Sequence, residues 1–390
     1  MTRKVCIVTG TRAEYGLLRG VIEGVSASTS LELQLIATGM HLAPEFGLTV
    51  REIEADGHAI DARIDMLLSA DSASGTTKSM GVGLIGFADA LQRLKPDLMV
   101  VLGDRFEIFA AAAAATVAGI AIAHLHGGES TEGACDEAFR HSITKMSHLH
   151  FVAAEPYRRR VIQLGEAPER VFLVGGLGVD AIARVPLLDR AALEAELGFR
   201  FAEKNLLVTF HPVTLEPGSG GQQLGELLAA LGELEDTRLI VTMPNADTEG
   251  RELARMVAEF CKARANASWF ASLGQQRYLS CMKQVDSVVG NSSSGIAEAP
   301  SFGIGTVNIG DRQRGRLKAE SVIDCVPERA AIAAALARLR SPEFVEVAKR
   351  ARNPYGEPGA SQKIVAELER HASAGLLKKS FHDLPAGAFA

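Results

Sequence analysis

Short apolar runs alternate with longer amphipathic stretches along most of this chain. Each run ends at a glycine or a polar residue, which is typical of a strand buried on both faces. We interpret as strands residues 5–9, 33–37, 98–102, 120–124, 150–153, 171–174, 206–210, 239–243, 287–289 and 305–308. We interpret as helices residues 15–25, 106–117, 136–146, 156–164, 222–233, 248–264, 275–284 and 328–340. This alternation predicts parallel sheets with helices on both faces.

The alternation occurs in two series, and residues 179–200, with Pro186 and an isolated helical stretch at 190–197, separate them. We therefore predict an α/β protein of two doubly wound, Rossmann-like domains, residues 1–180 and 181–357, that face each other across a cleft. Residues 358–390 are expected to form a helix that crosses back to the first domain, followed by a loose tail from Lys378. Ligands of such sheets bind beyond the carboxyl ends of the strands.

Composition and charge exclude several functions. The 390 residues are 47% hydrophobic and 23% charged, and 41 basic against 47 acidic side chains give a net charge of −6. This balance gives no long-range attraction for nucleic acid or for an acidic membrane, so neither is expected as a partner. The five cysteines are scattered without a C-x-x-C pair, and no apolar run is long enough to span a membrane or act as a signal peptide. We expect a cytoplasmic protein.

The most informative motif is Gly290-Asn291-Ser292-Ser293-Ser294-Gly295, which follows the strand at 287–289 and precedes a helical pattern. Backbone N–H groups and hydroxyls at the start of a helix attract anions, above all phosphates. The alternative is an ordinary serine N-cap.

Charged side chains follow two strands of the first series. Arg12 lies in TGTRAEYG, a motif without G-x-G-x-x-G or the P-loop lysine, and a cation at this corner suits a diphosphate. The alternative is a surface charge. Asp104 lies in LGDRFE, where α/β enzymes place catalytic groups, and the alternative is that it caps the next helix.

The next strand end carries further groups capable of acid–base chemistry. In HLHGGE these are His126 and Glu129, and Asp136 begins the helical stretch that follows. Asp136 also stands four residues before Arg140, so an ordinary i, i+4 ion pair is the alternative. The spacing of histidines on a strand end does not fit a metal site.

In the second series, His211 in FHPVT ends a strand before a proline, Asn245 ends the next strand, and Arg312 belongs to a loop with three arginines. Asn245 could instead cap a helix, and Arg312 could belong to an exposed basic loop. One set of strand ends thus presents groups for a nucleotide diphosphate, and the other presents carboxylates and histidine. This combination predicts a nucleotide-sugar enzyme without a metal or redox cofactor.

Ten motifs occur between residues 5 and 355 in a characteristic order: TGTRAEYG, GMHLAPEFG, LGDRFE, HLHGGE, DEAFRHSITKMSHLH, RVIQLGE, FHPVT, NADT, GNSSSG and NIGDRQRGR. Together they resemble the UDP-N-acetylglucosamine 2-epimerase superfamily, specifically its hydrolysing branch from bacterial sialic and legionaminic acid pathways. The resemblance implies a GT-B-type fold in which the C-terminal domain holds most of the nucleotide. A homodimer or homotetramer is expected.

The resemblance also implies roles for individual residues. Those implied to hold the diphosphate are Arg12, His211, Ser292, Ser293 and Arg312. Glu298 would bind the ribose hydroxyls, and Asn245 would lie near the substrate.

The resemblance implies catalytic residues as well. Asp104 and Asp136 match catalytic acids of the superfamily, and we also count His211 as catalytic. Many relatives have Glu at the position of His126, so the acid–base role at that corner falls to His126 or to Glu129.

The expected reaction converts UDP-N-acetylglucosamine and water into N-acetylmannosamine and UDP. Anti elimination of UDP would give a 2-acetamidoglycal, which water then hydrates, and no cofactor is required. The alternatives are the same reaction on UDP-N,N′-diacetylbacillosamine, a GT-B glycosyltransferase and a non-catalytic nucleotide-sugar sensor.

Overall fold

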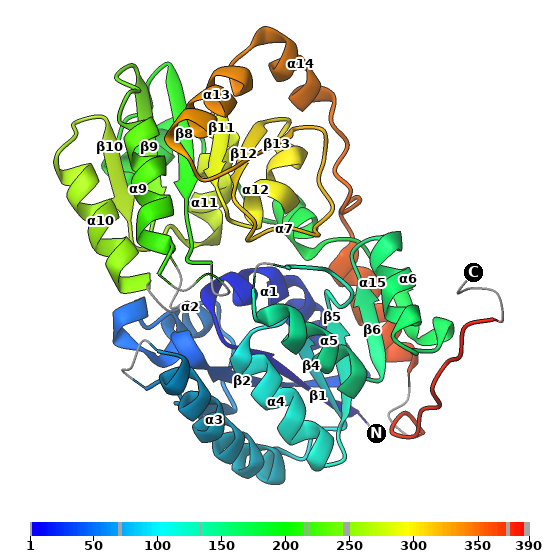
Figure 1. Ribbon diagram of the computed structural model, residues 1–390. Coiled ribbons are helices and arrows are strands. Elements are labelled where there is room, and N and C mark those ends of the chain that lie inside the picture. The colour runs from blue at the N-terminus through cyan, green and yellow to red at the C-terminus, as the bar shows by residue number, and fades with distance from the viewer. Residues whose placement is uncertain are drawn as a thin grey trace. The chain divides into compact units, whose positions relative to one another are not determined.

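The computed structural model describes residues 2–68, 72–132, 134–213, 216, 218–244, 250–371 and 375–385. Contacts divide the chain into two compact units (Figure 1). The first unit comprises Met1–Glu129, Asp136–Ala181 and Gly356–Ala390, and the second comprises Ser130–Cys135 and Ile182–Tyr355. The chain passes from the first unit to the second within helix α7 (Leu177–Arg184).

The first unit contains a seven-stranded parallel sheet with the order β3-β2-β1-β4-β5-β6-β7. Its strands are β1 (Arg3–Thr9), β2 (Leu31–Thr38), β3 (Ala62–Ile64), β4 (Leu98–Leu102), β5 (Ala121–Leu125), β6 (Leu149–Val152) and β7 (Val171–Leu173). Its helices are α1 (Arg12–Ala27), α2 (Val50–Ala55), α3 (Ala73–Leu94), α4 (Phe106–Val117), α5 (Asp136–Met146), α6 (Glu155–Gln163), α7 and α15 (Ala360–Arg370).

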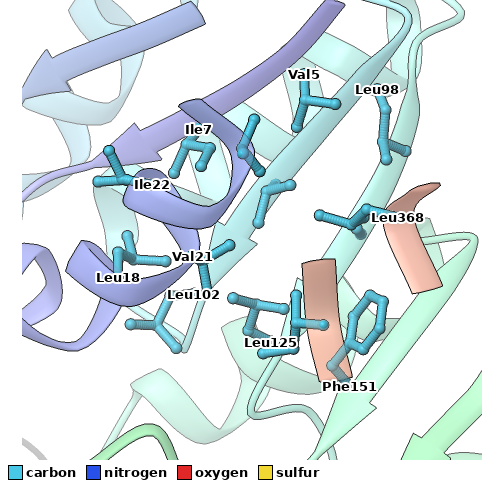
Figure 2. Close-up of a cluster of buried hydrophobic side chains, with 14 of the residues drawn as sticks. Val5, Ile7, Leu18, Val21, Ile22, Leu98, Leu102, Leu125, Phe151 and Leu368 are labelled. Carbon is cyan, nitrogen blue, oxygen red and sulfur yellow. The ribbon is translucent and has the colours of Figure 1, made fainter. Parts of the chain in front are cut away.

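Alternate side chains of each central strand enter different cores because successive residues point to opposite faces of a sheet. Val5 and Ile7 of β1 pack with α1 and with α15, which contributes Leu368 (Figure 2). Cys6 and Val8 pack on the other face with α3 and α4. Both faces of β1 are therefore covered, which explains why its sequence is a continuous apolar run.

The segment after α15 is not the loose tail that the sequence predicts, at least over residues 375–385. Lys379 donates hydrogen bonds to the buried Glu166 carboxylate, at 2.7 Å from Oε2, and to the carbonyls of Lys145 and Ser147, where α5 ends. The Phe381 ring lies against Gly165, where any side chain would collide with it. A buried ion pair and a ring contact thus anchor this segment to the first unit.

The second unit contains a six-stranded parallel sheet with the order β10-β9-β8-β11-β12-β13. Its strands are β8 (Lys204–Thr209), β9 (Thr237–Thr242), β10 (Ala267–Phe270), β11 (Ser287–Gly290), β12 (Gly305–Ile309) and β13 (Val322–Cys325). Its helices are α8 (Arg190–Leu197), α9 (Gly220–Leu231), α10 (Gly250–Lys262), α11 (Gly274–Gln284), α12 (Ser294–Ala297), α13 (Arg329–Leu339) and α14 (Pro342–Arg350). The two parallel sheets confirm the predicted fold class.

Candidate active site

Asp104 lies at the carboxyl edge of the first sheet, just after β4, and forms an ion pair with Arg140 of α5. Arg105, not Asp104, occupies the N-cap position of α4, so capping does not account for Asp104. On the neighbouring strand β5, His124 donates its Nε2 hydrogen to the Gly103 carbonyl at 2.7 Å. Neighbouring elements therefore hold both the Gly103 backbone and the Asp104 side chain.

Arg140 is almost fully buried, with 1% of its surface exposed, and its second partner is Glu137 at 3.2 Å. A guanidinium in this position needs paired carboxylates, since an unpaired buried charge is costly. Asp136 opens the same helix one turn earlier and is half-buried. Residues four apart share a helix face, so Asp136 lies on the same face of α5 as Arg140.

His126 and Glu129 form a hydrogen-bonded pair after β5, with 2.7 Å between His126 Nδ1 and Glu129 Oε1. The backbone N–H of Leu177 donates to His126 Nε2 at 3.2 Å, so this nitrogen accepts and Nδ1 carries the hydrogen donated to Glu129. His126 also has a φ of +63°, a left-handed conformation that few residues other than glycine adopt. Both ring nitrogens of His126 are therefore engaged, and Glu129 is 2% exposed.

Two buried carboxylates, Glu14 and Glu107, lie beside Gly10 at the same edge of the first sheet. Glu14 accepts hydrogen bonds from the backbone N–H groups of Gly10 and Thr11 and completes a capping box with Thr11. Arg105 donates to Glu107 at 2.8 Å. Burial, and after it the charge of Glu107, raise the pKa of Glu14 to about 8. Our sequence reasoning missed both acids, although TGTRAE has the T-x-x-E spacing of a capping box.

In the second unit, Asn291 connects the ends of two adjacent strands, β8 and β11. Its side chain accepts from the His211 backbone N–H at 2.7 Å and donates to the His211 carbonyl at 2.8 Å. Gly290 has a φ of +135°, and a Cβ there would lie 1.9 Å from the Thr209 carbonyl oxygen. The motif therefore needs glycine at 290 for close strand approach and asparagine at 291 to hold the His211 backbone.

The loop after β12 also contacts Asn291. Arg312 and Gln313 both donate to the Asn291 carbonyl, at 3.2 and 3.0 Å. His211, the serine turn and Arg312 are therefore brought together around one buried residue. Asn291, through its carboxamide and its backbone carbonyl, is the organising residue that sequence reasoning did not single out.

Helix α12 is a single turn, Ser294–Ala297, so the dipole argument made from the sequence contributes little here. The Ser293 carbonyl accepts from the backbone N–H groups of Ile296 and Ala297, and within the described part of this unit its side chain makes no capping hydrogen bond. The serine hydroxyls, not a long helix, are the distinctive groups of this turn. Glu298 follows α12 and is half-buried.

Two further features concern the predicted site. Asn245 falls outside the described residues. Of the residues implied to hold the diphosphate, Arg12 belongs to the first unit and the others belong to the second.

Among the described residues, no three His, Cys, Asp or Glu side chains are grouped closely enough to hold a metal ion. None of the helices described has both the length and the apolar character needed to cross a bilayer.

Solved structures share this architecture. A protein from Listeria monocytogenes described as a putative UDP-N-acetylglucosamine 2-epimerase superimposes with a TM-score of 0.81 at 18% identity, covering 99% of this chain and 100% of that one. The UDP-N-acetylglucosamine 2-epimerase of Neisseria meningitidis, bound to UDP-N-acetylglucosamine, gives a TM-score of 0.80 at 19% identity, covering 94% and 100%. The fold is thus a two-unit α/β fold of the GT-B type.

Sequence comparison then defines the family. The family model for UDP-N-acetylglucosamine 2-epimerase matches residues 23–369. A Campylobacter jejuni protein named GDP/UDP-N,N′-diacetylbacillosamine 2-epimerase (hydrolyzing) is 41% identical over 98% of this chain and 99% of its own length. The polysialic acid biosynthesis protein P7 of Escherichia coli is 37% identical over 98% of both chains. The chain belongs to the UDP-N-acetylglucosamine 2-epimerase family and is an enzyme of that class.

Proposed function

We propose that this chain is a hydrolysing 2-epimerase that converts a UDP-linked 2-acetamido sugar and water into the free C2 epimer and UDP. The observation that carries the proposal is the full-length, 41% identity to a relative whose name specifies a hydrolysing 2-epimerase. The site supports it, because carboxylates gather at the sheet edge of the first unit, and hydroxyls, a histidine and a guanidinium gather at that of the second.

In the proposed reaction, a carboxylate removes the C2 proton while the C1–O bond breaks and UDP leaves as an anion. Water then adds to the resulting glycal: its oxygen bonds to C1, and a proton returns to C2 on the other face. The C2 proton is only weakly acidic, so the base must be positioned and desolvated. Positive and hydrogen-bonding groups around the diphosphate stabilise the charge that develops on the leaving group.

The residues are divided between these two tasks. Asp104, Glu129 and Asp136 transfer protons to and from the sugar. His126 orients Glu129, since both ring nitrogens of His126 are already hydrogen-bonded. Residues that hold the diphosphate are Arg12, His211, Ser292, Ser293 and Arg312. Glu298 binds the ribose, and Asn245 contacts the substrate.

We infer that the sugar is the diacetylated 6-deoxy compound, UDP-N,N′-diacetylbacillosamine, which the sequence analysis gave as the alternative to UDP-N-acetylglucosamine. Two relatives named for the diacetylated sugar are 41% and 38% identical to this chain. The Neisseria meningitidis relative named UDP-N-acetylglucosamine 2-epimerase is 31% identical. The diacetylated sugar is therefore the stronger proposal and UDP-N-acetylglucosamine the second.

The experiment incubates the enzyme in D₂O with each UDP-sugar and with the GDP-linked diacetylated sugar, without an acceptor. We expect UDP and a C2-deuterated free sugar, and kcat/KM about tenfold or more higher for the diacetylated UDP-sugar. Retention of protium at C2 would exclude elimination, and UDP release only with an added acceptor would indicate a glycosyltransferase. A higher kcat/KM for UDP-N-acetylglucosamine or for the GDP-sugar would overturn the substrate assignment.

A further inference from the structure

Five hydroxyl groups follow one another along the carboxyl edge of the second sheet. Thr242 and Thr209 end the adjacent strands β9 and β8, and their hydroxyls lie 2.5 Å apart. Thr209 lowers the pKa of the Tyr278 hydroxyl on α11, and Tyr278 is hydrogen-bonded to Ser294. Ser294 in turn lies 3.0 Å from the Ser292 hydroxyl.

Each hydroxyl has one hydrogen to donate, so the chain has two self-consistent directions. If the hydrogens point toward Thr242, Ser292 donates to Ser294 and presents only lone pairs to a ligand. If they point the other way, Ser294 donates to Ser292, and the Ser292 hydrogen is available for an anion. The Ser294 backbone N–H donates to Ser292 Oγ, at 3.4 Å, and this bond is compatible with the second direction because, within the turn, Ser292 Oγ only accepts in it.

We propose that Tyr278 is a positioning residue that aligns the serine hydroxyls of the Asn-Ser-Ser-Ser turn as donors to the diphosphate of the substrate. This inference rests on the proposed function, because it assumes that Ser292 contacts the diphosphate. A bound anion selects the outward direction, and each hydroxyl then polarises the next one. Tyr278 is the link through which the ends of β8 and β9 act on the turn.

The chemistry of tyrosine suits this task. Burial is the largest cause that raises the pKa of Tyr278 to about 12, and the charge of Glu298 acts in the same direction. The phenol therefore keeps its hydrogen at neutral pH and stays a hydroxyl. Phenylalanine would preserve the ring packing and remove only the hydrogen-bonding group, which makes Tyr278→Phe a matched substitution.

The test measures binding of UDP and of uridine to the full-length enzyme and to Tyr278→Phe by calorimetry or NMR. We expect Tyr278→Phe to weaken UDP binding about tenfold, because Ser294 loses its buried tyrosine partner. Uridine lacks phosphates, so its affinity should change less than about twofold. In combination with Ser294→Ala, Tyr278→Phe should add little, since its effect passes through Ser294. Thr242→Val changes the hydroxyl farthest along the chain from Ser292 and should weaken UDP binding less than Tyr278→Phe does.

Ser292→Ala separates the failure of this inference from the failure of the proposed site. Unchanged UDP affinity in Ser292→Ala would refute the phosphate assignment itself. Weaker UDP binding in Ser292→Ala but not in Tyr278→Phe would overturn only the positioning role. Equal losses for UDP and uridine in Tyr278→Phe would also overturn it, since they would indicate a general distortion. If Tyr278→Phe does not fold, Thr209→Val interrupts the same chain and the same criteria apply.

Discussion

Arg140 shows how one buried charge can organise side chains that are proposed to be catalytic. The sequence places it four residues after Asp136, a spacing that an exposed helix uses for surface ion pairs. In the structure its guanidinium is buried and pairs with Asp104, which lies 36 residues earlier in the chain. The sequence identifies the acid at the strand end but gives no sign of the partner that orients it, because that partner comes from another element.

We predict that Asp104→Asn will lower kcat by about a hundredfold or more, because an amide cannot act as an acid or a base. The affinity for UDP should change by less than about threefold, since Asp104 is proposed to act on the sugar. Steady-state kinetics and UDP titration measure the two effects. Asp89→Asn, at an exposed position on α3 of the same unit, is the control and should leave both unchanged. Wild-type turnover in Asp104→Asn would remove this residue from the proposed mechanism.

The buried Glu14 makes stability depend on pH in a definite direction. Its pKa is raised from 4.5 to about 8, first by burial and then by Glu107. The folded state therefore binds a proton more tightly than the unfolded state does. The stability that this proton contributes is complete below pH 4.5 and is lost as the pH rises toward 8.

Glu14→Gln should remove this dependence, because glutamine can keep the capping box without a titratable charge. We expect the variant to exceed the wild type in stability at pH 8, by a few kcal/mol in order of magnitude, and the difference to disappear near pH 4. Thermal unfolding at several pH values measures it. Parallel curves for the two proteins between pH 4 and pH 8 would contradict this account.

The hydropathy pattern led to the expectation of a loose tail in the C-terminal segment, residues 375–385, which the structure does not show. Its residues mix polar and apolar side chains, and Lys379 in isolation indicates an exposed tail. The structure places its ammonium group on the buried Glu166, which also accepts from His150 at 3.0 Å and from Lys145. Burial alone would raise the pKa of Glu166, but hydrogen bonds from His150, Lys145 and Lys379 lower it to about 2.

Lys379→Met should therefore destabilise the protein by about 1–3 kcal/mol, because a buried carboxylate loses one of its partners. The loss should be seen above pH 4.5 and should shrink as the pH falls toward 2 and Glu166 becomes protonated. Chemical or thermal unfolding measures it. Lys378→Met changes an adjacent, exposed lysine and serves as the control. Equal stability of the two variants would show that the anchor contributes nothing.

The apolar pattern predicted the central strands and their helices well, since these are buried on both faces and have strong periodicity. The α4 and α5 helices begin and end where the sequence indicates. The pattern missed β3, which is three residues long, and α3, a helix with four glycines. Two of those glycines, Gly83 and Gly86, let α3 approach Met66 and Ile64 so closely that a Cβ would collide. Glycine lowers helix propensity, so this packing requirement conceals the helix.

Prediction of the candidate site from the sequence is limited in a similar way. Motifs at strand ends drew attention to Asp104, His211 and the serine turn, because parallel strands bring their carboxyl ends to one edge. They did not identify Arg140, the organising role of Asn291 or the hydroxyl chain through Tyr278. Those depend on pairs of residues distant in sequence, such as Asn291 and His211. No local pattern encodes such contacts.

The proposed roles divide the chain by unit, with one exception. Ser292, His211 and Arg312 belong to the second unit, whereas Arg12 begins α1 in the first. If Arg12 holds the diphosphate as proposed, UDP binding stabilises the first unit as well as the second. A nucleotide held by the second unit alone would stabilise only that unit.

Hydrogen exchange of the full-length enzyme distinguishes these cases. UDP at about a hundred times its Kd should stabilise what it binds by about 2.7 kcal/mol, so exchange should slow in core strands of both sheets, such as β1 and β8. Arg12→Met should confine the slowing to the second unit and weaken UDP binding, while Arg51→Met, at an exposed position in the first unit, should behave as the wild type. Exchange that slows in both units of Arg12→Met as in the wild type would contradict the role of Arg12, because the stabilisation of the first unit would then not pass through its guanidinium.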